Sequence, residues 1–112
     1  MRNADALLAS SPAIRYVAVH VDDELRTVQR PDLAQASSSE SDRYEEILVN
    51  PTLLAILVQH GNIHCGGMRA VLVRYGHFTQ LVAPAPGGHV SIAIEPAGTL
   101  AIAGELLDRL RG

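Results

Sequence analysis

Hydrophobic and polar residues alternate along the chain in short stretches, and most of these have the two-residue period of a β-strand. Residues 14–21 are rich in β-branched side chains, and residues 25–30 alternate after an Asp22-Asp23 turn signal. Two such stretches joined by a short polar turn predict a β-hairpin. Three further strands are predicted at residues 68–75, 78–83 and 89–94. Residues 84–88, Pro-Ala-Pro-Gly-Gly, are predicted to be the loop between the last two.

Three other stretches have the composition and spacing of helices. They cover residues 4–11, about 39–60 and 99–110. The second is predicted to begin near Ser39 or Asp42, where two capping-box patterns overlap, and to end at Gly61-Asn62. Pro51 interrupts its apolar pattern, so this stretch forms either one kinked helix or two short helices.

The predicted order of elements is α-β-β-α-β-β-β-α. Short turns join neighbouring strands, so we expect an α+β fold with a central five-stranded antiparallel sheet and helices packed on it. Residues 70–73 are all apolar, which predicts that both faces of the sheet are covered. The chain has 112 residues and no internal linker, so residues 1–112 are predicted to form a single domain.

Composition and charge narrow the classes of partner. The net charge is −3 and all nine basic residues are Arg, which argues against a nucleic-acid-binding module. The longest apolar run, residues 53–58, is far shorter than the roughly 20 residues of a membrane-spanning helix, so no membrane partner is expected. The single Cys excludes an internal disulfide and favours a cytoplasmic location.

Residues that could carry chemistry are few and scattered. His60, His64 and Cys65 come closest to a metal site or a nucleophile–base pair, but a zinc site needs further ligands. The favoured interpretation is a loop with two exposed histidines and a half-buried thiol. Clustered carboxylates are interpreted as solvated groups at a helix start, stabilised by the helix dipole; they are Glu40, Asp42, Glu45 and Glu46. The sequence therefore predicts no catalytic residues, no metal site and no cofactor.

Three segments carry a resemblance to a known family. They are Leu7-Leu8 with Pro12-Ala13-Ile14 and the strand that follows, MRAVLVRYGHFTQLV at residues 68–82, and GGHVSIAIEP at residues 87–96. Together they resemble the roadblock family, dynein light chain-like domains that also occur as bacterial partners of small Ras-like GTPases. The resemblance implies a bacterial member with a profilin-like sandwich and a sheet of order 2-1-5-4-3. It also implies no chemistry of its own, and a dimer joined through the third strand and the long helix.

The expected function is that of a non-enzymatic homodimeric regulatory or scaffold protein, with a small Ras-like GTPase as a candidate partner. An exposed third strand would offer its free backbone groups to a second copy. The residues expected at this interface are Tyr44, Leu48, Arg69, Val71 and Val73. The alternative is a small-molecule sensor, which needs an apolar pocket between sheet and helices with a few polar groups. The third hypothesis is a cysteine- or metal-dependent enzyme that uses His60, His64 and Cys65.

Overall fold

Five antiparallel strands form the centre of the molecule. The computed structural model describes residues 4–30 and 44–111 of the chain. The strands are β1 (Ile14–Val21), β2 (Glu24–Gln29), β3 (Val71–Arg74), β4 (Thr79–Ala85) and β5 (Gly88–Ile94). They pair in the order β2-β1-β5-β4-β3, so β2 and β3 are the two edges of the sheet. The predicted α+β class, element order and strand order are confirmed.

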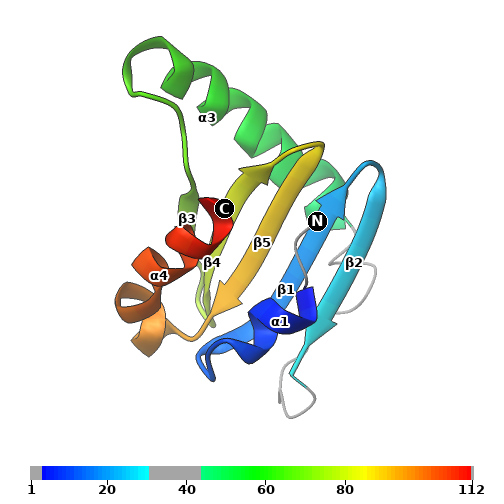
Figure 1. Cartoon of the computed structure of the whole chain (residues 1–112), viewed down its shortest axis with the longest axis vertical. Coiled ribbons are helices and arrows are strands. Elements are labelled where there is room, and N and C mark those ends of the chain that lie inside the picture. Colours follow the sequence, from blue (N-terminus) through cyan, green and yellow to red (C-terminus); the bar gives the residue numbers. More distant parts are fainter. Residues whose placement is uncertain (1–3, 31–43, 112) are drawn as a thin grey trace.

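Helices cover both faces of this sheet, as Figure 1 shows. On one face lie α1 (Ala4–Ala9) and α4 (Thr99–Arg111), and a short 3₁₀ turn, η2 (Pro96–Gly98), connects β5 to α4. On the other face a π-helical turn, η1 (Glu45–Val49), continues directly into α3 (Asn50–His64). The expectation that both faces are covered is therefore confirmed.

The two faces of the sheet differ in character. Alternate apolar side chains of the central strands, such as Val17, Leu81 and Ile92, pack with Leu106 of α4 and with α1 in the main core. The remaining positions face η1 and α3, where buried polar side chains join the apolar ones. These polar residues are Glu46, Asn50, Gln80, His89 and Ser91. Buried chemical groups are thus concentrated in the layer beneath the long helix.

Pro51 is accommodated inside one continuous helix. A proline within a helix removes one backbone hydrogen bond, and its ring clashes with the carbonyl group four residues earlier. Here the turn before Pro51 is widened, and Asn50 N–H donates to the carbonyl of Glu45, five residues earlier. Of the two arrangements that the sequence leaves open, the structure has a single helix with a π-helical turn.

The end of this helix differs from the sequence prediction. The helix passes Gly61-Asn62, where the sequence predicts its end, and continues to His64. A glycine ends a helix most readily with positive φ, and the first such glycines after Pro51 are Gly66, at 73°, and Gly67, at 95°. The predicted helix start, near residues 39–42, lies outside the described residues.

The third and fourth strands also differ from their predicted bounds. The sequence predicts a loop over residues 84–88, but β4 continues through Pro84 to Ala85. β3 is shorter than the predicted 68–75 and pairs with β4 only as far as Val82. Beyond that point β4 has no partner strand on the β3 side. No strand there needs the N–H group that Pro84 lacks.

The tips of the two hairpins pack against each other. Asp22 and Asp23 form the predicted turn, with φ of 52° and 67°, the left-handed conformation that a two-residue hairpin turn needs. Asp22 N–H donates to the carbonyl of Gly87 at 3.1 Å. Gly88 lies so close to β1 that a Cβ atom there would overlap the carbonyl oxygen of His20. This packing fixes His20 beside the turn between β4 and β5.

Candidate functional site

The residues expected at a subunit interface fall into two groups. Tyr44 and Leu48, at the start of the long helix, are 62% and 54% exposed, and η1 lies over β1. Arg69 precedes β3 and is exposed, while Val71 and Val73 on β3 are half-buried. β5 and β4 separate β1 from β3, so the two groups are about 14 Å apart across the sheet, at about 4.8 Å per strand.

Exposed apolar side chains are concentrated on these same elements. Among the described residues, every large apolar side chain that is exposed lies on the long helix, including Tyr44 at its start, or on β3 and the residue that follows it. We name this set the helix–edge surface; it consists of Tyr44, Ile47, Leu48, Val49, Ile56, Leu72 and Tyr75. The exposed large apolar side chains of the described residues thus lie on one helix and at one sheet edge. Leu72 pairs with the core residue Leu81, so its side chain lies on the face of the sheet opposite the long helix.

Tyr75 lies within electrostatic reach of the helix start. It follows β3, and its ring packs against Phe78 with ring centres 5.3 Å apart. Partial burial raises the pKa of the Tyr75 phenol above its ordinary value of 10.0, and the charges of Glu45 and Glu46 raise it further. Both carboxylates belong to η1.

A buried polar network lies beneath η1. The centre of this network is Glu46, which is only 1% exposed. Its Oε1 accepts hydrogen bonds from Asn50 Nδ2 at 2.9 Å and from His89 Nε2 at 2.8 Å. Its Oε2 accepts one from the Tyr16 hydroxyl at 3.3 Å. Three donors suit an ionised carboxylate, which only accepts. The hydrogen bond to Glu46 holds the buried His89 ring with Nε2 toward the carboxylate.

The sequence pattern does not reveal the role of Glu46. The interpretation of Glu46 as a solvated carboxylate at a helix start is wrong, because η1 lies on the sheet and turns this side chain inward. The signal that could reveal it is the spacing of Glu46, Asn50 and Leu54, which recur every four residues and are all buried. Two of these three side chains are polar, so the inner face of the helix looks like a solvent-facing one.

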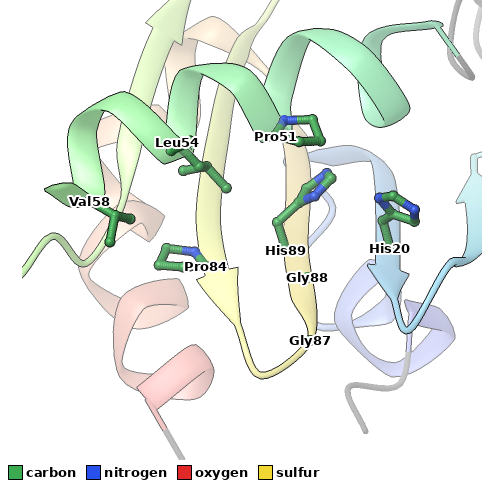
Figure 2. Close-up of a pocket in the computed structure, with 9 residues that line it drawn as sticks. His20, Pro51, Leu54, Val58, Pro84, Gly87, Gly88 and His89 are labelled. Atoms are coloured by element: carbon green, nitrogen blue, oxygen red, sulfur yellow. The ribbon is translucent and has the colours of Figure 1, made fainter.

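A pocket of about 390 Å³ opens between α3 and the sheet (Figure 2). Five apolar residues line it: Pro51, Leu54, Ala55, Val58 and Pro84. His20 and His89 add polar groups from directly paired positions on β1 and β5. Their rings meet edge to face with centres 5.4 Å apart, and both point from the sheet toward α3. The backbone of Gly87 and Gly88 completes the lining.

His60 and Cys65 form no site with the side chains that the structure describes, and the side chain of His64 lies outside that description. His60 is exposed, and Cys65 is an exposed free cysteine, not the half-buried thiol that the sequence predicts. Cys65 follows the last residue of α3, where the helix extends beyond the strands (Figure 1). Among the side chains that the structure describes, no group of three His, Cys, Asp or Glu residues is placed to hold a metal ion.

Comparison with known proteins gives no family for this chain. No protein-family model matches it, and no curated protein matches it. In the part of the chain that the structure describes, no helix is both long enough and apolar enough to cross a membrane. The resemblance to roadblock domains therefore stays a prediction from the sequence.

Proposed function

We propose that the protein is a non-enzymatic regulatory or scaffold protein that works as a homodimer, with the helix–edge surface as its interface. One observation carries this proposal: the exposed large apolar side chains of the described residues lie on the long helix and at the β3 edge, and none lies on α1, α4, β1, β2, β4 or β5. A contiguous apolar patch on a folded protein marks an interaction site, and Ile47, Leu48 and Val49 are consecutive exposed apolar residues at the start of the long helix. Covering such a patch contributes about 25 cal/mol for each Å² of apolar area removed from water.

A second copy of the chain is the occupant that the geometry favours. β3 is an edge of the described sheet, so its outer backbone groups are available to another strand. Two copies related by a two-fold axis can pair β3 with β3, because the same edge then meets itself. A pairing centred on Leu72 sets Val71 opposite Val73 and Arg74 opposite Ala70. This register gives apolar cross-strand pairs and avoids facing two arginines.

One interface of ordinary size includes both groups of residues. A stable interface covers about 800 Å² on each partner, a patch roughly 28 Å across. The helix start and the sheet edge are about 14 Å apart across the sheet. A dimer joined at β3 would thus continue the sheet through both copies and bring the two long helices together on one face.

The proposed partner class is a small Ras-like GTPase, and the resemblance of the sequence to roadblock domains is its basis. A cytoplasmic location belongs to the same proposal, because the single cysteine excludes an internal disulfide. Affinity capture from native extract, followed by mass spectrometry, is expected to recover a Ras-like GTPase whose rate of GTP hydrolysis or nucleotide exchange changes on binding. Recovery of no such GTPase, or of one whose rates stay unchanged, contradicts the regulatory part of the proposal.

Light scattering after size-exclusion chromatography tests the dimer. The expected mass at tens of micromolar is about 24 kDa, twice the 12.0 kDa of one chain. Leu48→Glu combined with Leu72→Glu is expected to give a monomer, because both side chains are exposed and the fold does not need them. Thr27→Glu is the matched control, since it adds a charge at an exposed position of β2, the opposite sheet edge. A monomeric parent chain, or a double variant that still dimerises, contradicts this interface.

The pocket favours a second candidate function, that of a small-molecule sensor. Ligand sites are concave, mostly apolar and about 300–1,000 Å³ in volume, with a few polar groups that fix the orientation of the ligand. The pocket under α3 has these features at the small end of the range. It uses the inner side of the helix, whereas the proposed dimer uses the outer side. Saturable binding of a small organic molecule by the purified protein tests this function.

A further inference from the structure

The lining of the pocket selects against charged ligands. Leu54 and Val58 of α3 face Pro84 of β4 across it, and none of its nine lining residues is Arg, Asp or Glu. A charged molecule would lose its hydration there without meeting an opposite charge in the lining, which is strongly unfavourable. The walls therefore favour an uncharged and mainly apolar molecule.

His20 and His89 are the side chains that can hydrogen-bond to such a molecule. Among the described residues, the ring nitrogens of His20 have no hydrogen-bond partner, and His89 uses only Nε2. A neutral imidazole has one donor and one acceptor nitrogen. Both rings point into the space below α3 (Figure 2), so they offer a donor and an acceptor to the same ligand group.

Glu46 determines which nitrogen of His89 is left for a ligand. Because Glu46 accepts the hydrogen bond from Nε2, Nδ1 remains as the acceptor of the ring. An anionic ligand at Nδ1 would face the Glu46 carboxylate across one imidazole, and the two charges would repel each other. A hydroxyl group avoids this repulsion, and it both donates and accepts.

We infer that this pocket binds a small, uncharged, apolar alcohol or phenol, whose hydroxyl donates to His89 Nδ1 and accepts from His20. The inference rests on the second candidate function, that of a small-molecule sensor. His20 and His89 contact the hydroxyl, while the apolar part of the ligand lies against α3. Glu46 is a positioning residue, because it acts on the ligand through His89.

Three fluorescent probes of one shape test this inference: 2-naphthol, naphthalene and 2-naphthoate. The chain has no Trp, so no indole emission overlaps the fluorescence of the probes. We expect 2-naphthol to bind saturably, about five- to hundredfold more tightly than naphthalene, which is the effect of two neutral hydrogen bonds. We expect 2-naphthoate to bind more weakly than 2-naphthol. His20→Phe keeps a ring but removes both nitrogens, so the preference for 2-naphthol over naphthalene should shrink.

Two exposed positions on α3 provide matched variants. Ala55 lines the pocket, so Ala55→Phe fills it and is expected to abolish binding of 2-naphthol. Gln59 is exposed and does not line the pocket, so Gln59→Phe adds the same ring and is expected to leave binding unchanged. Far-UV circular dichroism checks that both variants are folded. Unchanged affinity in Ala55→Phe overturns the assignment of this pocket as the binding site.

The remaining outcomes separate the ligand class from the sensor function. Equal affinity for 2-naphthol and naphthalene overturns the role of the two histidines, although an apolar sensor pocket then remains. Tightest binding of 2-naphthoate overturns the choice of an uncharged ligand and again leaves a sensor. If no probe binds saturably, the inference and the sensor function fail together, whereas the dimer is judged by its own mass measurement.

Discussion

Replacing Glu46 by Ala tests the buried polar network beneath η1. The substitution removes the acceptor of three hydrogen bonds and leaves the buried side chains of His89 and Asn50 without it. Each buried donor that is left without its acceptor costs about 1–3 kcal/mol. Hydrogen bonds to a charged group contribute about 1.5–3 kcal/mol each, and the 3.3 Å bond from Tyr16 is the weakest of the three. We therefore expect Glu46→Ala to lower the free energy of unfolding by about 2–6 kcal/mol, the sum for the two buried donors of His89 and Asn50.

Urea unfolding followed by far-UV circular dichroism measures this loss. All variants are compared at one protein concentration, because dimerisation would make the apparent stability depend on concentration. A domain of this size has an unfolding free energy of about 5–15 kcal/mol, so the loss is a large fraction of the total. Glu46→Gln keeps an acceptor oxygen and is expected to lose less, about 1–3 kcal/mol. The exposed Glu105 of α4 gives the control, and Glu105→Ala should stay within about 0.5 kcal/mol of the parent chain.

A double-mutant cycle with His89 tests the reasoning itself. If Glu46 and His89 stabilise each other, Glu46→Ala and His89→Ala together cost less than the sum of the two single losses, by about 0.5–3 kcal/mol. Additive losses would refute the assignment of a coupled pair. A loss below about 1 kcal/mol for Glu46→Ala would refute the conclusion that its burial contributes to stability, since that value is typical of an ordinary substitution.

The remaining predictions concern two glycines and one tyrosine. Gly88→Ala should prevent native folding, because its Cβ would overlap the His20 carbonyl oxygen; a cooperative melt like that of the parent would contradict this. Gly104→Ala, in an open position of α4, should instead raise stability by up to about 1 kcal/mol in the same urea assay. Folding raises the pKa of Tyr75 above 10.0. The contribution of Tyr75 to the free energy of unfolding is therefore complete below pH 10.0 and is lost as the pH rises through the pKa of the folded state. Tyr75→Phe should therefore lose less stability than the parent above pH 10.0, and equal losses in urea titrations at pH 9 and 11 would contradict this.

The fold follows from local patterns because turn residues bound most of its strands. β1 covers the predicted residues 14–21, and α4 begins at the predicted Thr99. The errors lie where a neighbouring element decides the outcome. Pro84 remains in β4 because β3 does not extend beside it. In the same way, the helix passes Gly61 because the left-handed turn that ends it comes later, at Gly66.

The candidate site follows from the sequence only in part, for a related physical reason. An excess of apolar residues on one helix and one strand is visible in the chain, and Tyr44 and Leu48 of that helix are exposed, while their role as interface contacts stays a prediction. The burial of Glu46 could not, because a carboxylate leaves water only where donors compensate for its lost hydration. Two of its donors, Tyr16 and His89, are positioned by the pairing of β1 with β5. The buried charge is therefore a property of the assembled sheet, and no pattern within the helix contains it.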